Sequence, residues 1–289
     1  MLIKIGPCVQ HFKILLSMLF LGALGLLLYC GVSKSGGDIT FVERVIRFQF
    51  EVSNVSNDFI EENHFRFLVP AELSDRQTML NIKSDYDISV LSGDGRKRYA
   101  KVDLGAMAPR SIKIVVVDVR VAVADGAIKD RVNKELYLAD ARYAESNSKE
   151  IRMIADEFAL KSPQSVFKWG AANIAKDDYQ PEPKGAIAAV SSRSGDCTEH
   201  MFTFIALARS LEIPSRGLAG FVIEGDVGLV SASEYHNWAE YYDHGAWRIA
   251  DTFFEVLDES YSKYVIFDMP DGSGKQSFVT ASDSLEVRL

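Results

Sequence analysis

The stretch Ser194–His200 reads SGDCTEH and leads directly into the apolar run Met201–Leu211. Asp196 is a residue type that caps helix N-termini, and Glu199, three positions later, completes a capping-box pattern. This pattern predicts a helix with Cys197 in its first turn. Because the first turn carries free N–H groups and the positive end of the helix dipole, it favours a thiolate. The sequence therefore predicts a nucleophilic cysteine, beside N–H groups suited to binding an oxyanion.

Two predicted strands downstream add an imidazole and a carboxylate. Residues 235–242 (YHNWAEYY) contain His236, and residues 247–252 (WRIADT) contain Asp251. A turn that pairs residues whose numbers sum to 487 would place these two side chains directly opposite each other. A shift of one residue would separate them onto opposite faces. Together, Cys197, His236 and Asp251 are predicted to form a catalytic triad of thiol, imidazole and carboxylate. The alternatives are that Cys197 is a buried structural cysteine and that the two strands form a surface hairpin.

Three separated motifs carry a family resemblance. The sequence GDC before an apolar helix, HNWAE from His236 and WRIAD ending at Asp251 resemble the motifs of the transglutaminase-like superfamily, over roughly residues 135–254. The resemblance implies Cys197 as nucleophile, His236 as general base and acid, and Asp251 as the residue that orients His236. It also implies a papain-like core, in which the cysteine helix packs against an antiparallel sheet. Because the superfamily includes cross-linkers, peptidases, deamidases and inactive relatives, the resemblance leaves the reaction open.

The N-terminal region predicts a membrane anchor. Residues 14–32 are uncharged and long enough to span a bilayer. Lys4 and Lys13 precede this run, which predicts a cytoplasmic N-terminus and export of the rest of the chain. We expect a single-pass protein of the bacterial inner membrane, with its catalytic domain in the periplasm or outside the cell. Cleavage after Ser33 would instead give a secreted protein.

The chain is predicted to have an α+β fold, with a papain-like, transglutaminase-like core preceded by an antiparallel β-sandwich and an N-terminal transmembrane helix. Alternating apolar residues, such as those from Ile46 to Val52, predict the sandwich. The predicted segments are a cytoplasmic tail (1–13), a transmembrane anchor or uncleaved signal (14–32), a linker (33–39), the β-sandwich (40–125) and the catalytic domain (126–289). In this topology Cys197 is the single exported cysteine, which favours a reactive role.

Composition argues against other classes of protein. A formal net charge of -8 argues against nucleic-acid binding. No glycine loop suits a phosphate group, and the aspartates do not match a calcium loop, so we expect no cofactor and no metal. His200, on the cysteine helix, is a rival base by proximity, to which we assign a structural role. His244 is expected in an exposed turn.

Together these features predict a cysteine-dependent acyl-transfer enzyme that acts on peptide or glutamine-type amides through a thioester. Hydrolysis and cross-linking differ only in whether water or an amine reaches the acyl-enzyme, so peptidase and transglutaminase or deamidase activities remain open. The expected partners are a protein or peptide substrate and, through the N-terminal helix, the membrane. The alternative is a catalytically idle envelope scaffold that binds protein or peptide through the β-sandwich and the cleft.

Overall fold

The computed structural model describes residues 39–73, 75–93, 97–270 and 278–289. The predicted cytoplasmic tail and transmembrane anchor, and the linker up to residue 38, lie outside the described residues. Among the described residues, no helix is both long and apolar enough to cross a membrane. Residues 40–289 form one compact unit.

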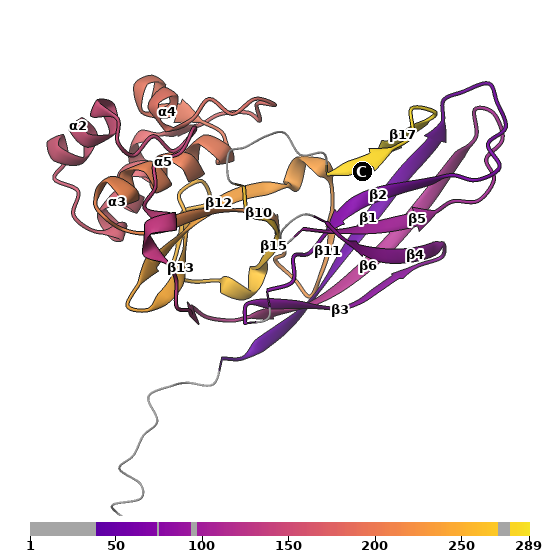
Figure 1. Ribbon diagram of the computed structural model, residues 1–289, viewed down its shortest axis with the longest axis horizontal. Coiled ribbons are helices and arrows are strands. Elements are labelled where there is room, and N and C mark those ends of the chain that lie inside the picture. Colours follow the sequence, from indigo (N-terminus) through magenta and orange to yellow (C-terminus); the bar gives the residue numbers. More distant parts are fainter. Residues whose placement is uncertain (1–38, 74, 94–96, 271–277) are drawn as a thin grey trace, which may run out of the picture. The chain divides into compact units, whose positions relative to one another are not determined.

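Two sheets built mainly from the first half of this unit share one apolar core (Figure 1). The first has the order β11 (Val227–Val230), β1 (Phe41–Asn54), β6 (Ile112–Ala124) and β3 (Gln77–Ser84), with β17 (Leu285–Arg288) also paired to β1. The second has the order β16 (Val279–Ala281), β2 (His64–Val69), β5 (Arg98–Asp103) and β4 (Asp87–Ser92). The predicted alternation is present, since Phe48 and Phe50 of β1 and Val117 and Val119 of β6 are fully buried.

Three strands from the C-terminal half complete these two sheets. Strand β17 pairs with β1 and β16 pairs with β2, both antiparallel, whereas β11 runs parallel to β1. The described strand pairs within residues 40–125 are antiparallel, as expected for the sandwich, and the parallel pair brings in a strand from outside that range. A parallel pair needs a long connection, and β1 and β11 are far apart in the chain. Strands from beyond residue 125 thus take part in both sheets.

A third sheet and a group of helices form the other half of the unit. The sheet has the order β14 (Val256–Leu257), β13 (Ala246–Asp251), β12 (His236–Asp243), β10 (Ser215–Val222) and β15 (Tyr264–Asp268), with β7 (Ile128–Lys129) paired to β13. The helices are α2 (Lys149–Glu157), α3 (Pro163–Asn173), α4 (Ala186–Ser192) and α5 (Cys197–Ser210). Short elements are β8 (Ala175–Lys176), β9 (Ser194–Gly195) and the 3₁₀ turns η1 (Lys134–Tyr137), η2 (Ala232–Glu234) and η3 (Tyr261–Lys263).

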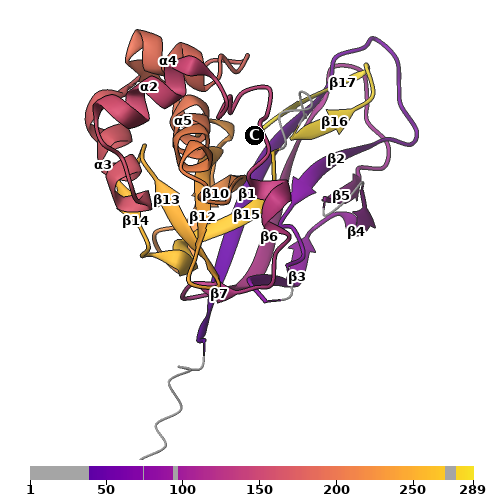
Figure 2. The same cartoon turned by 60° about the vertical axis from the view of Figure 1, so that its left-hand side comes forward.

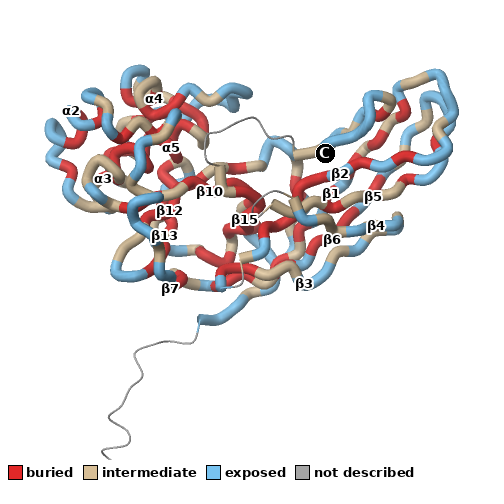
Figure 3. Tube along the Cα trace, in the orientation of Figure 1, coloured by how far each residue is buried: buried red, intermediate tan, exposed pale blue. Residues whose placement is uncertain are grey.

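Helix α5 is the central helix of this half. Figures 1 and 2 show the four α-helices on the same side of the sheet formed by β10, β12 and β13. Phe204 and Ile205 of α5 share an apolar core with Tyr241 of β12 and Ala250 of β13. Buried residues run along α5 and the central strands in Figure 3. This packing fixes the first turn of α5 relative to the starting end of β12.

Candidate active site

The first turn of α5 presents a cysteine on a capped helix. Cys197 is the first helical residue, and its side chain is partly exposed. The predicted capping box is present: Asp196 accepts a hydrogen bond from the Thr198 backbone N–H at 2.8 Å, and Glu199 accepts from the Asp196 backbone N–H. The Asp196 side chain thus accepts hydrogen bonds from the backbone N–H groups of Thr198 and Glu199, and the thiol stays accessible.

The two carboxylates of the cap also hold the preceding loop. The Gln180 N–H donates to Asp196 Oδ2, and the Lys184 N–H donates to Glu199 Oε1, each at 2.8 Å. Glu199 is buried, which raises its pKa. A Cβ at Gly195 would lie 2.3 Å from the Glu199 Cβ, so only glycine fits beside this side chain. The loop is therefore fastened next to the cysteine.

His236 joins the cysteine to a carboxylate. It is the first residue of β12 and is 4% exposed. Its Nε2 lies 2.7 Å from Asp251 Oδ2, and Cys197 is near enough to influence its pKa. Burial acts to lower the pKa of His236, but the hydrogen bonds and charges of Asp251 and Cys197 outweigh it and raise the pKa from 6.5 to about 9. The geometry therefore favours a protonated imidazole at neutral pH.

Asp251 is held by four donors. It is the last residue of β13 and 1% exposed. Its Oδ2 accepts from His236 and, at 2.9 Å, from the hydroxyl of Tyr264; its Oδ1 accepts from the backbone N–H groups of Phe253 and Phe254 at 3.1 and 3.0 Å. A carboxylate with this many donors has a fixed orientation. The structure thus brings together the three side chains predicted as a triad.

The register of the hairpin differs from the expected one. Strands β12 and β13 pair residues whose numbers sum to 489, as in Asp243 with Ala246. The expectation that His236 lies directly opposite Asp251 was therefore wrong by two residues. The central turn residues are His244 and Gly245, with φ of 48° and 83°, a combination typical of two-residue hairpin turns. Because a shift of two residues preserves the alternation of side chains, the two residues still meet.

The other two histidines near the motifs lie in different surroundings. His200 is buried; its Nδ1 lies 3.2 Å from the Thr252 hydroxyl, and its ring meets Phe253 edge to face. Burial lowers the pKa of His200 to about 4, so this side chain is neutral at physiological pH. His244 lies in the hairpin turn, with 84% of its side chain exposed. In the described residues, no group of three or more His, Cys, Asp or Glu side chains is arranged to hold a metal ion.

Two polar residues of the site were not predicted from the sequence. Tyr264 reaches Asp251 from β15, and no local pattern marks it, because β15 meets the hairpin only through the fold. Asn237 donates from its Nδ2 to Thr198 Oγ1 at 3.0 Å and contacts Cys197 Sγ at 3.8 Å. Its position beside His236, as a polar residue on a face that meets α5, was a signal that could have found it.

A buried ion cluster lies further along β12. Glu240 is 1% exposed, and its Oε2 accepts from Nε and Nη2 of Arg216 at 2.9 and 2.7 Å. Its Oε1 lies 3.7 Å from Arg76, which belongs to the segment before β3. The Arg216 guanidinium lies 4.0 Å from the centre of the Trp247 ring. This cluster ties the hairpin to the first half of the unit.

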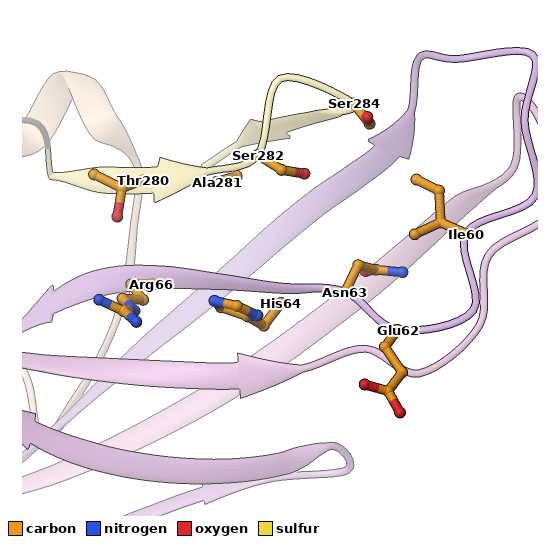
Figure 4. A pocket seen from close by; sticks show the side chains of 9 residues that line it. All are labelled: Ile60, Glu62, Asn63, His64, Arg66, Thr280, Ala281, Ser282 and Ser284. Atoms are coloured by element: carbon orange, nitrogen blue, oxygen red, sulfur yellow. The ribbon is translucent and has the colours of Figure 1, made fainter.

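A hollow of about 390 Å³ lies in the first half of the unit, and Figure 4 shows the side chains that line it. It is bordered by β2, β16 and the turn before β17, and it is lined by Ile60, Glu62, Asn63, His64, Arg66, Thr280, Ala281, Ser282 and Ser284. None of Cys197, His236 and Asp251 lines it, so the candidate chemistry lies elsewhere.

Comparison with known proteins agrees with the fold and with the motifs. Residues 148–252 match the model of the transglutaminase-like superfamily, so the chain carries a domain of this superfamily. No curated protein matches the chain. A solved structure of a candidate cysteine protease from Cytophaga hutchinsonii is 16% identical, with a TM-score of 0.55, and the match covers 86% of this chain and 91% of that one. This likeness shows a shared fold.

Two more distant structures also match. The periplasmic domain of TgpA from Pseudomonas aeruginosa is 15% identical with a TM-score of 0.38, covering 76% of this chain and 90% of that one. Red sea bream transglutaminase is 11% identical with a TM-score of 0.24, covering 75% of this chain and 49% of that one. The fold is of the α+β class, and residues 148–252 carry the match to the transglutaminase-like superfamily.

Proposed function

We propose that this protein is a cysteine acyl-transfer enzyme that acts on peptide or glutamine-type amides. The observation that carries the proposal is the position of His236, whose Nε2 lies 2.7 Å from Asp251 and whose pKa is raised by Asp251 and by the neighbouring Cys197. A buried, oriented imidazole beside a partly exposed thiol at a helix N-terminus is the arrangement that activates a nucleophile.

The proposed reaction has two halves. In the first, His236 holds the thiol proton, Cys197 Sγ bonds to the amide carbon, and the carbonyl electron pair moves to oxygen. The pair then returns, the C–N bond breaks, and His236 gives its proton to the leaving amine. In the second, water or another amine attacks the thioester, with His236 taking the proton from the nucleophile and returning it to sulfur. Water gives hydrolysis or deamidation, and an amine gives cross-linking.

The test is incubation of the protein with peptide libraries, with and without an added primary amine, followed by mass spectrometry. Cleaved peptides indicate a peptidase, glutamate in place of glutamine indicates a deamidase, and amine adducts indicate a transglutaminase. The rate of alkylation by iodoacetamide at neutral pH is an independent measure of the reactivity of the Cys197 thiol. Absence of all three products, together with alkylation no faster than that of a free thiol, would instead support the binding scaffold.

The pH dependence of catalysis should report the His236–Asp251 pair. We expect kcat/KM on a peptide found in the library to fall as pH rises through about 9, because His236 then loses the proton that it gives to the leaving amine. Asp251→Asn removes the charge that raises the pKa of His236. It should therefore move this alkaline limb towards neutral pH and lower activity at pH 7 by about 10²-fold.

Asp243→Asn is the matched control for this experiment. Asp243 also pairs with a histidine, His244, but the pair lies in an exposed turn. Its pH profile should overlay that of the unchanged protein. An alkaline limb that stays in place in Asp251→Asn would contradict the proposed coupling of Asp251 to His236.

We also propose that the catalytic unit lies outside the cytoplasm, held by the segment at residues 14–32. The support is the uncharged length of this segment and the lysines before it. Residues beyond Gly36 should then be digested by protease added to spheroplasts, and an alkaline phosphatase fused after Leu289 should be active. Activity of a reporter that functions only in the cytoplasm, when it is fused after Leu289, would overturn both the proposed anchor and the proposed export.

A further inference from the structure

A side-chain amide lies beside the nucleophilic sulfur. The Nδ2 of Asn237 donates to Thr198 Oγ1 at 3.0 Å and lies 3.8 Å from Cys197 Sγ, within the range of a hydrogen bond to sulfur. An amide NH₂ group has two N–H bonds. The Thr198 hydroxyl therefore fixes the rotation of the amide through one N–H, and the other is available at the sulfur.

One backbone donor of the helix end is also free. The side chain of Asp196 accepts from the backbone N–H groups of Thr198 and Glu199. No hydrogen bond within the described residues uses the Cys197 backbone N–H. The first turn thus leaves a single unpaired N–H, and it belongs to the residue that carries the thiol. Two donors, one from a side chain and one from the backbone, lie next to Sγ.

The chemistry of acyl transfer needs donors in this place. When Sγ bonds to the carbonyl carbon, the carbonyl oxygen becomes negatively charged while it is held two bonds from the sulfur. Donors that stabilise it lie about 2.7–3.1 Å from that oxygen. An N–H group that is 3.8 Å from the sulfur can be at this distance from an oxygen that lies between the two.

We propose that the Asn237 side-chain amide, with the Cys197 backbone N–H, binds the oxyanion of the tetrahedral intermediate. The proposal rests on the function proposed above. In the resting enzyme the Asn237 N–H contacts the sulfur. As Sγ bonds to the carbonyl carbon and the carbonyl electron pair moves to the oxygen, the same N–H donates to that oxygen. No proton is transferred from Asn237, and when the intermediate collapses the electron pair returns to the C=O bond. Asn237 is in this sense a catalytic residue.

A purely structural role predicts different behaviour. In that case Asn237 only fastens β12 to α5 through Thr198, and its loss would disturb the placement of His236 beside Cys197. Alkylation by iodoacetamide separates the two roles, because it consumes the thiolate without forming an oxyanion. An oxyanion donor affects amide turnover alone, whereas a misplaced His236 slows both turnover and alkylation.

The experiment compares four variants of the full chain. Asn237→Ala should lower kcat on the library-derived peptide by about 10²- to 10³-fold while the alkylation rate stays within about threefold of the unchanged protein. Asn237→Ser, which is polar but too short to reach the sulfur, should behave in the same way and serves if Asn237→Ala does not fold. Thr198→Val keeps the amide and should lose less than about tenfold. Asn173→Ala, which removes a partly buried asparagine bound to Trp169 O on α3, is the matched control and should have no effect on kcat.

Each other outcome overturns the inference. An unchanged kcat in both Asn237 variants removes the donor role, and equal losses of turnover and alkylation assign Asn237 to positioning. A loss of kcat in Thr198→Val as large as that in Asn237→Ala would show that the contact between Asn237 and Thr198, which holds β12 against α5, accounts for the effect. If the unchanged protein turns over no amide, the proposed function fails. The inference about Asn237 is then tested with a peptide aldehyde, which forms a tetrahedral adduct with the thiol and has no leaving group. Binding of the aldehyde that is not weakened in Asn237→Ala then overturns this inference separately.

Discussion

Cys197→Ala is expected to fold and to lose acyl transfer by about 10⁴- to 10⁶-fold. In the proposed mechanism the sulfur forms the bond to substrate, and no other described side chain beside His236 offers a nucleophile of that kind. The fold should survive, because the side chain is partly exposed and the helix cap is made by Asp196 and Glu199. Turnover of the library-derived peptide and thermal unfolding measure the two effects.

The same experiment assigns the base. His236→Ala should be nearly as severe, because the sulfur loses its proton acceptor and the leaving amine its proton donor. The double variant should be scarcely slower than either single one, since residues that act as a unit are not additive. His200→Ala should retain most activity, because His200 contacts Thr252 and Phe253. If the His200→Ala protein is inactive while the His236→Ala protein is active, the role of the base belongs to His200.

A surface histidine provides the matched control. His244 lies in the exposed hairpin turn with a positive φ, which asparagine tolerates, so His244→Asn should keep both the fold and the activity. Full activity in Cys197→Ala would contradict the proposed mechanism as a whole.

Glu240→Ala is expected to lower the free energy of unfolding by about 3–5 kcal/mol. Glu240 is buried between two guanidinium groups, those of Arg216 and Arg76. Burial already lowers the pKa of Arg76, and the charge of Glu240 opposes this effect. Without the carboxylate, the buried charge of Arg76 and the partly buried charge of Arg216 remain with no negative partner between them. Urea unfolding measures the change.

An exposed ion pair gives the comparison for this loss. Glu224 Oε2 forms an ion pair with Lys263 Nζ at 2.6 Å, but 75% of the Glu224 side chain is exposed. Glu224→Ala should therefore change the free energy of unfolding by less than about 1 kcal/mol. Glu240→Gln keeps the shape and the hydrogen-bond acceptor and should fall between the two. A Glu240→Ala protein as stable as the Glu224→Ala protein would show that the cluster is not needed for stability.

Local patterns were sufficient for several features of the fold. The capping box at Asp196 and Glu199 set the start of α5 and placed Cys197 in its first turn, because a cap depends on residues three positions apart. The alternation in β1 predicted which side chains enter the core, since side chains in a strand point to opposite faces in turn. The same rule kept His236 and Asp251 together, even though the register was wrong by two residues.

Other features depended on contacts between distant parts of the chain. The hairpin register followed from the backbone of His244 and Gly245, whose positive φ angles the composition of the turn did not specify. Tyr264 reached Asp251 because β15 pairs with β10, and β17 joined β1 across most of the chain length. The sequence by itself determined the local periodicity and the helix cap, which involve neighbouring residues. The tertiary structure alone decided which strands pair and which polar groups meet in the core, because these depend on the packing of the whole unit.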